Sequence, residues 1–407
     1  MNEQLPLMLI LLILLLFSKV FGELFERIGI PALTGEILAG LLLGPTVLGL
    51  VADSHEIRAI ADLGVLMLIV MAGLEIRGSE VRTALKGKNI WIVVLCFLVP
   101  GSGGFLVGYL FGFDILFNIF LGFWIAVAAL PVSIRILMDL GKLHTDIGRL
   151  IISTAMINDI LSLLILGVML DVHEYSVFTA EFTSTLLLNL LRVVAFMSIL
   201  MIFYRIFRIA RNRVGIISPK LNHFLKLLKG RESLFALCMI FVLAFSGLAQ
   251  VMGLHFVIGT FFGDILNPRE LFPEEDFDKV KKTTQGVTMG FLAPIFFAYI
   301  GVLIDVKSLT NILFFVFILI TVLTGKTLSG YLGGRIAGMS HMKSLTLGIG
   351  LNTKGIMELI IANIALQRGF IDINVFTVLV IIAVITTIGT PFMLKRAFRL
   401  VDKAESV

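Results

Sequence analysis

Long apolar runs separated by short polar stretches fill almost the whole chain. Most runs approach the roughly 20 residues that an α-helix needs to cross the hydrocarbon core of a bilayer. The pattern predicts an all-α polytopic membrane protein with about 13 transmembrane helices. The predicted spans cover residues 5–24, 30–50, 57–76, 89–112, 115–139, 147–170, 183–205, 232–250, 253–268, 286–304, 309–337, 344–366 and 373–395.

The composition agrees with a membrane protein. Of the 407 residues, 58% are hydrophobic and 15% are charged, and the mean hydropathy is +1.03; no soluble domain needs so much apolar surface. Glu3 rather than a basic region precedes the first apolar run, so we expect a retained helix and not a signal peptide. Cys96 and Cys238 lie in apolar runs and the six histidines are scattered, so no disulfide framework, metal cluster or cofactor is expected.

The basic residues predict the orientation in the membrane. If the N-terminus is outside, Arg58, Lys307 and Arg368 are the only basic residues of the connecting segments on the outer side of the membrane. The other basic residues of these segments, including the cluster at 205–231, then lie on the inner side. The positive-inside rule therefore predicts an outer N-terminus and a cytoplasmic C-terminus, with residues 401–407 as a short cytoplasmic tail. We interpret the net charge of +5 and the 205–231 cluster as determinants of topology. A lipid- or regulator-binding patch is the alternative, and no nucleic-acid partner is expected.

An odd number of spans is typical of two six-helix repeats of inverted topology joined by a linker, here 183–205. Corresponding spans of the two halves carry helix-breaking sequences. The span 115–139 contains Pro131, which would remove a helical hydrogen bond, and the span 344–366 contains glycines and polar residues at membrane depth. Paired discontinuous helices indicate a transport site. The predicted broken-helix residues are Pro131, Gly350, Asn352, Thr353 and Gly355. Several glycines also allow a break in the span 309–337.

Asp159 lies in the middle of the apolar run from about 147 to 170, with Asn158 beside it. A carboxylate at the membrane centre costs at least ~2.5–3.5 kcal/mol on insertion scales, and such residues mark ion or proton pathways. The alternative is an aspartate that a buried lysine neutralises for packing only.

Two lysines and a glutamate lie, like Asp159, in predicted membrane spans. Lys326 lies deep in an apolar stretch, and Lys354 and Glu358 are four residues apart, so they share a helix face and can pair. We expect Lys326 and Lys354 to supply positive charge where two helices break, Asp159 to supply the exchangeable negative charge, and Glu358 to neutralise Lys354. A purely structural ion pair is the alternative for the last two residues.

Several segments, in this order along nearly the whole chain, carry a resemblance to a known family. They are Gly35–Pro45, Leu63–Glu75, Pro131–Leu137, Asn158–Asp159, Gly259–Phe261, Pro294–Gly301, Gly325–Lys326 and Asn352–Leu359. The set resembles the monovalent cation:proton antiporter-2 family, and within it the cation/proton exchanger branch.

The resemblance implies a homodimer with an elevator-like alternating-access motion. It implies core ion-translocation helices in 89–170 and 309–395, and dimerisation or scaffold helices in 1–76 and 232–304. Asp159 would be the residue that binds the cation and carries the proton, and the spans 115–139 and 344–366 would cross. No nucleotide-binding domain follows the last span, so regulation is expected from a separate subunit or from pH.

The chain also departs from the family pattern. Many relatives have two adjacent acids, where this chain has Asn158 before Asp159; one charge fewer favours electroneutral, one-for-one exchange. Many relatives also have a Thr-Ser pair where this chain has Ala128 and Ala129, so Ser133 is the remaining hydroxyl near the break.

We therefore predict a secondary transporter, not an enzyme, in a cell (inner or plasma) membrane. Asp159 binds either a proton or a dehydrated Na⁺ or K⁺, and the empty charged state cannot move because an unpaired carboxylate in low dielectric is costly. No phosphate-binding loop for primary pumping is present. A sodium-coupled symporter of a small organic solute and a passive channel or sensor are the alternatives.

Overall fold

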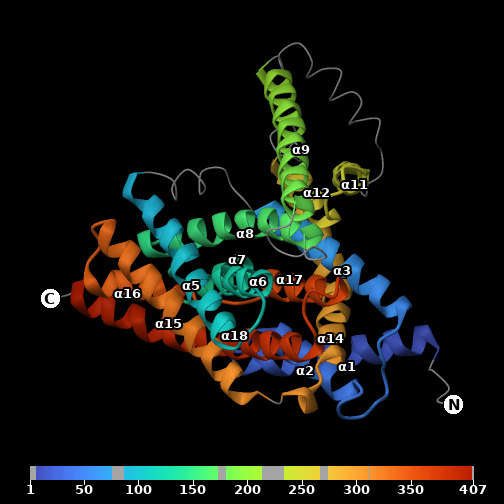
Figure 1. Ribbon diagram of the computed structural model, residues 1–407, viewed down its shortest axis with the longest axis horizontal. Helices are drawn as coiled ribbons and strands as arrows, with labels where there is room; N and C mark the ends of the chain where they lie inside the picture. Colours follow the sequence, from blue (N-terminus) through green and yellow to red (C-terminus); the bar gives the residue numbers. More distant parts are fainter. Residues whose placement is uncertain are drawn as a thin grey trace. The chain divides into compact units, whose positions relative to one another are not determined.

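The computed structural model describes residues 6–75, 87–172, 180–212, 233–265, 274–309 and 311–405. In these ranges the regular elements are helices and no strand occurs, which confirms the all-α prediction (Figure 1). Most of the basic segment 205–231 lies outside the described residues.

The helices follow the predicted apolar runs closely. Nine described helices are long and apolar enough to cross a membrane, and the segments Ala32–Leu43, Ile115–Ala126 and Ile356–Gln367 form shorter apolar helices. The helices are α1 (Leu7–Arg27), α2 (Ala32–Leu43), α3 (His55–Glu75), α5 (Ile90–Leu110), α6 (Ile115–Ala126), α7 (Leu130–Asp139), α8 (Asp146–Val172), α9 (Ala180–Asn212), α11 (Ser233–Val251), α12 (Phe256–Ile265), α13 (Glu274–Val287), α14 (Ala293–Leu303), α15 (Ile312–Ile336), α16 (His341–Gly350), α17 (Ile356–Gln367) and α18 (Ile373–Glu405). A π-helical turn, Thr288–Leu292, joins α13 to α14.

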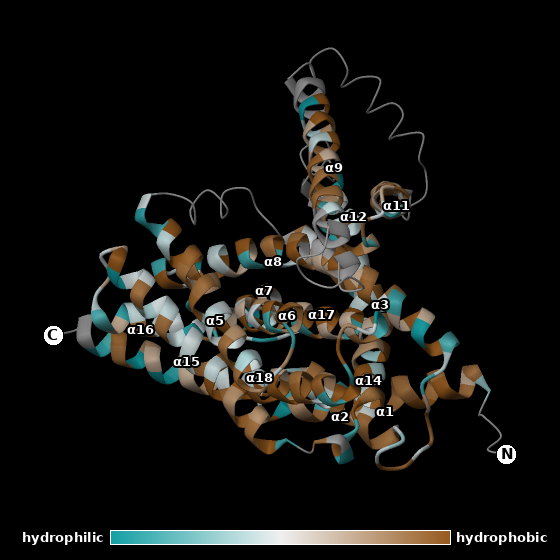
Figure 2. Ribbon diagram, in the orientation of Figure 1, coloured by the Kyte–Doolittle hydropathy of each residue, from teal (hydrophilic) through white to brown (hydrophobic). Residues whose placement is uncertain are grey.

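The chain divides into two compact units. The first comprises Met1–Ala61, Arg77–Leu166 and Pro294–Val407. Within it α5 packs against α6 and α15, α15 packs against α16, α16 packs against α18, and α1 packs against α2. Figure 2 shows α1 and much of α18 in the brown of apolar residues, as expected for membrane-spanning helices. The predicted division into core and dimerisation helices remains a prediction.

The glycines of α15 allow close packing and do not break the helix. The segment Ile312–Ile336 is one continuous helix, so the allowed break in this span is absent. A Cβ on Gly330 would lie 2.4 Å from the Cα of Gly348 in α16, which means that the two backbones are in contact there. The absence of side chains therefore brings α16, and the break that follows it, against α15.

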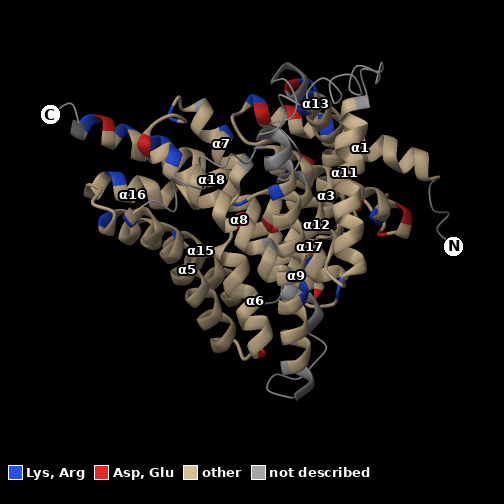
Figure 3. Cartoon of the chain, turned by 90° about the horizontal axis from the view of Figure 1, so that it is seen from above, with Lys and Arg blue, Asp and Glu red and all other residues tan. Residues whose placement is uncertain are grey.

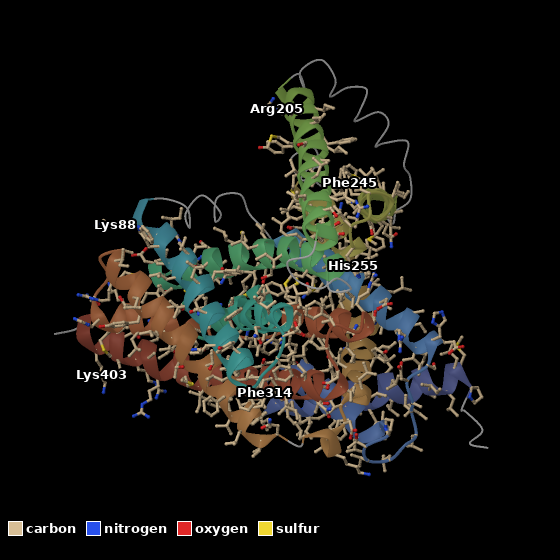
Figure 4. The ribbon with its side chains drawn as sticks, in the orientation of Figure 1. Lys88, Arg205, Phe245, His255, Phe314 and Lys403 are labelled. Carbon is tan, nitrogen blue, oxygen red and sulfur yellow. The ribbon has the colours of Figure 1, made fainter. Side chains whose placement is uncertain are left out.

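The second unit comprises Asp62–Ile76 and Gly167–Ala293. Phe245 in α11 belongs to an apolar cluster of this unit, which also contains buried residues of α9 and α12 (Figure 4). The buried members of this cluster are Phe196, Leu200, Phe245, Ala249, Leu254 and Ile258.

Most charged side chains lie near the ends of helices. In Figure 3, blue and red mark the C-terminal part of α18 and blue marks the N-terminal part of α16, whereas α5 and α6 are almost entirely tan. The buried charged residues of the described chain are few: Glu36, Asp159, Lys326, Lys354 and Glu358. The last four belong to the site described next.

Candidate functional site

Two helices of the first unit are interrupted at the predicted positions. The first break separates α6, which ends at Ala126, from α7, which begins at Leu130; Val127 and Ala129 have extended backbones. Pro131 lies in the first turn of α7 and not in mid-helix. The first helical turn tolerates proline because its missing N–H has no partner there. The expected cost of a mid-helix proline is therefore avoided.

The second break lies between α16, which ends at Gly350, and α17, which begins at Ile356. The two interruptions contact each other. The N–H of Ala129 donates to the carbonyl of Thr353 at 3.0 Å, and the hydroxyls of Ser133 and Thr353 share a hydrogen bond of 2.6 Å. A Cβ on Gly355 would lie 2.6 Å from Cγ2 of Val132, so the crossing requires glycine at this position.

Lys354 caps the carbonyl end of α6. Its Nζ donates to three backbone oxygens, those of Trp124 at 2.9 Å, Ile125 at 3.0 Å and Val127 at 3.0 Å. An ammonium has three N–H donors, so all of them are used. The Nζ also lies 4.6 Å from the centre of the Trp124 ring. The carbonyls at a helix C-terminus lack helical partners and carry partial negative charge, which the buried ammonium offsets.

Lys326 of α15 completes this arrangement. Its Nζ donates to the carbonyls of Cys96, at 3.2 Å, and Ala126. The two lysines therefore satisfy the four consecutive carbonyls from Trp124 to Val127. The prediction that both lysines supply positive charge at a helix break agrees with this geometry.

Asp159 of α8 is buried, with 1% of its surface exposed. Neither carboxylate oxygen has a hydrogen-bond partner of regular geometry among the described residues. The groups that act on it electrostatically are Glu358, the backbone of Leu130 at the start of α7, and Lys326. Asn158 donates from Nδ2 to Ala126 O at 3.5 Å, and its Oδ1 has no partner in the described part of the chain.

Glu358 forms the expected ion pair with Lys354 and also caps a helix. Oε2 accepts a hydrogen bond of 2.8 Å from the N–H of Gly355 and so caps α17. Oε1 lies 3.8 Å from Nζ of Lys354, but no hydrogen bond joins them and Oε1 is without a partner among the described residues. The expected pair is therefore an ion pair without a hydrogen bond, because the Lys354 donors are directed to carbonyls.

Further residues hold the crossing together. Asn352 donates to the hydroxyl of Thr327 at 2.7 Å, and the hydroxyl of Thr387 donates to Lys354 O at 2.7 Å. The indole N–H of Trp124 donates to Glu358 O at 3.0 Å. Sequence reasoning missed Trp124, Thr327 and Thr387. A tryptophan and isolated hydroxyls in apolar runs were the available signals. Gly350 contacts Ile151 of α8, since a Cβ there would lie 2.3 Å from its Cδ1.

The described residues contain no group of three or more His, Cys, Asp or Glu that could hold a resident metal ion. The site instead holds one buried carboxylate, that of Asp159, whose two oxygens have no hydrogen-bond partner of regular geometry among the described residues, and the opposite charges of Lys326 and Glu358 both act on it. Such a site suits a proton or a weakly held monovalent cation.

Comparisons with known proteins agree with this chemistry. Residues 10–400 match the family model described as "Sodium/hydrogen exchanger, transmembrane". The chain is 28% identical to the Na⁺/H⁺-K⁺ antiporter GerN of Bacillus cereus over 394 residues, covering 96% of each protein. It is 29% identical to the Na⁺/H⁺ antiporter of Enterococcus hirae, covering 95% of this chain and 96% of the relative. The fold is similar to that of the sodium proton antiporter MjNhaP1 of Methanocaldococcus jannaschii, with a TM-score of 0.70, 15% identity and 96% of both chains covered. The chain belongs to the transmembrane sodium/hydrogen exchanger family.

Proposed function

We propose that the protein is a secondary antiporter that exchanges Na⁺ or K⁺ for H⁺ across a membrane by alternating access, with Asp159 as the exchange site. Family membership and the names of its relatives support antiport, and GerN supports potassium beside sodium. The observation that carries the role of Asp159 is its buried carboxylate, whose two oxygens have no hydrogen-bond partner of regular geometry among the described residues.

The mechanism is competition for this carboxylate. An ionised, unpartnered carboxylate in a low-dielectric surrounding is unfavourable, so Asp159 is expected to hold either a proton or a cation during the movement of the protein. Oδ1 of Asn158 is also unpartnered in the described structure and supplies a second oxygen ligand. Ser133, whose hydroxyl lies between Ala129 O and Thr353 Oγ1, supplies a third.

The fixed charges favour a one-for-one exchange. Lys326 and Lys354 are held by carbonyls, so neither has to leave its position when Asp159 changes its ligand. Proton-loaded and cation-loaded forms of Asp159 then have the same charge, and the transport cycle is electroneutral.

The finer architecture is part of the proposal. The chain would belong to the cation/proton exchanger branch, with thirteen spans in two inverted repeats joined by 183–205. The core would move against dimerisation helices in a homodimer of the cell membrane, with the N-terminus outside, and regulation would come from a separate subunit or from pH. The paired breaks, one in each predicted repeat, support the repeat arrangement.

A symporter of an organic solute is not favoured. Its site would need several polar groups free to bind a solute. At the crossing, the hydroxyls of Thr353 and Thr387 already make hydrogen bonds to protein atoms, and the relatives are named as antiporters.

The test uses purified protein in liposomes with a trapped pH dye, to which Na⁺, K⁺ and Li⁺ are added in turn. We expect cation addition to collapse the pH gradient with the parent protein, and Asp159→Asn to reduce the rate to that of empty liposomes. Asp402→Asn is the matched control, because Asp402 is an exposed partner of Lys142. A fully active Asp159→Asn protein would refute the proposed site, and a repeat at set membrane potentials measures electroneutrality.

A further inference from the structure

An arginine lies in the apolar part of α9. Arg192 is the only charged residue from Phe182 to Tyr204, and it is half-buried. Its Nη1 donates to Oδ1 of Asn189 at 3.0 Å, and the described residues contain no other hydrogen bond of this guanidinium. A guanidinium has five N–H donors. Because a charged residue inside a membrane span is costly unless it has a partner, the remaining donors of Arg192 indicate a ligand.

The guanidinium lies against the turn that joins α11 to α12. A Cβ on Gly253 would lie 2.9 Å from Nη1 and 3.0 Å from Cζ of Arg192. The partial negative charge of a helix C-terminus attracts a cation, which is the purely structural explanation of this contact. The carbonyls of Leu248, Ala249 and Gln250 at this end of α11, however, already accept hydrogen bonds from the N–H groups of the turn. The guanidinium is therefore not needed to satisfy them, and its donors remain for another partner.

Asn189 adds a second kind of donor to the site. Its side chain is fully buried, with 0% of its surface exposed. Oδ1 is occupied by the hydrogen bond from Arg192, whereas Nδ2 has no partner among the described residues. A buried N–H group without an acceptor is unfavourable. The polar atoms that these two side chains still offer are all donors, so the complementary ligand is an anion.

The surface beside these donors is apolar. Leu188, one helical turn before Arg192, is 46% exposed, and Leu191 is 64% exposed. A ligand that matches both features has an anionic head and hydrocarbon chains. The guanidinium fork binds phosphate through paired N–H···O bonds, and basic pockets between transmembrane helices bind lipid headgroups.

We propose that Arg192 and Asn189, at the turn between α11 and α12, bind the phosphate group of an anionic membrane lipid. The acyl chains of this lipid lie along the exposed apolar side of α9, next to Leu188 and Leu191. The site lies wholly within the second unit, and the inference does not depend on transport through Asp159.

The test follows thermal unfolding of the purified protein in a non-ionic detergent. Phosphatidylglycerol, phosphatidylcholine or inorganic phosphate is added in increasing amounts. We expect phosphatidylglycerol to raise the melting temperature saturably by a few degrees, since a ligand of the native state stabilises it. Phosphatidylcholine, which has no net charge, and inorganic phosphate, which has no acyl chains, should have little effect at the same concentrations. Arg192→Met should weaken the apparent affinity for phosphatidylglycerol at least several-fold.

Asn189→Asp is the sharper variant because it hardly changes the size of the side chain. It places a carboxylate where Oδ1 already accepts a hydrogen bond from Arg192. This internal anion should take the place of the lipid phosphate, so the response to phosphatidylglycerol should fall as it does in Arg192→Met, in a protein that still folds. Arg205→Met is the matched control. Arg205 is exposed on the same helix, far from the α11–α12 turn near His255 (Figure 4), and its loss changes the net charge equally, so the parent response should remain.

Several outcomes overturn the proposal. A parent protein that does not respond to phosphatidylglycerol, or that responds equally to phosphatidylcholine or to inorganic phosphate, has no site for an anionic lipid. An undiminished response of Asn189→Asp would place the lipid elsewhere. An equal loss of the response in Arg205→Met would reduce the effect to net charge. If Arg192→Met does not yield folded protein, Asn189→Asp and Arg205→Met decide the question.

Discussion

The positive and the negative groups at the helix crossing differ in how their polar atoms are bound. Lys326 and Lys354 direct their ammonium groups to backbone carbonyls, and Lys354 uses all three donors in this way. Asp159 and Glu358 together have three carboxylate oxygens without a hydrogen-bond partner in the described part of the chain. All four side chains are buried, so the difference does not arise from exposure to water.

In the proposed mechanism, this difference separates the structural charge of the lysines from the exchangeable charge of Asp159. The lysines replace partners that the broken helix α6 has lost, so their positions are fixed by the fold. Burial of the two unpartnered oxygens of Asp159 costs free energy, and a bound proton or cation offsets this cost. Four predictions test the comparison, from the largest expected effect to the smallest.

Lys326→Met is expected to have the largest effect. It removes the lysine donor from the carbonyls of Cys96 and Ala126, of which Ala126 keeps only the 3.5 Å bond from Asn158, and it removes the opposite charge that acts on Asp159. Unfolding should be easier by about 3 kcal/mol, the lower range for breaking a buried charged interaction, and exchange in liposomes should fall more than tenfold. Lys395→Met, at an exposed position of α18, is the control. Normal exchange by Lys326→Met would show that this lysine is not part of the fixed charge.

Gly355→Ala tests the crossing itself without changing any charge. The new Cβ would lie 2.6 Å from Cγ2 of Val132 and 2.9 Å from Cβ of Ala129, so the two interruptions must move apart. Overpacking of this kind costs about 1–3 kcal/mol, measured by chemical or thermal unfolding, and should also slow exchange. Gly389→Ala in α18 has no atom within 4 Å of its new Cβ and should be neutral. Equal stability of the two variants would contradict the close approach.

Ser133→Ala separates ion binding from packing. The variant loses the 2.6 Å hydrogen bond to Thr353, which is worth about 1 kcal/mol. If Ser133 is a cation ligand, the cation concentration for half-maximal exchange should rise several-fold while the maximal rate is kept. A lower maximal rate with unchanged half-saturation would instead assign Ser133 to the structure of the crossing.

The ion pair between Arg135 and Glu26 should contribute least. Its atoms are 2.8 Å apart, but the two side chains are 55% and 36% exposed, and exposed pairs typically contribute about 0.2–1 kcal/mol. A double-mutant cycle with Arg135→Ala and Glu26→Ala measures the coupling. A coupling above about 2 kcal/mol would mean that exposure is a poor guide to the strength of charged pairs in this protein.

Hydrophobic periodicity and helix-breaking residues predicted much of the fold. The ends of α6 and α16 lie at the expected breaks, and Asp159 lies in the apolar helix that the sequence indicated. Two details differ from the expectation: Pro131 lies in the first turn of α7 rather than in mid-helix, and the break that the glycines of α15 allowed does not occur. Both differences have the same origin. Proline and glycine in a sequence mark positions with an unusual backbone, but they do not show whether the position is a helix start, a helix break or a close contact with another helix.

The sequence by itself determined the class of protein, the course of its helices, and the identity of the few charges inside the membrane, because the cost of burying polar groups restricts where they can occur. Only the tertiary structure decided how these charges are used. Lys354 binds carbonyls 227–230 positions away in preference to a hydrogen bond with Glu358, four positions away. Backbone carbonyls are present at every residue, so no sequence pattern reveals which of them a broken helix releases. That choice leaves Oε1 of Glu358 without a hydrogen-bond partner among the described residues.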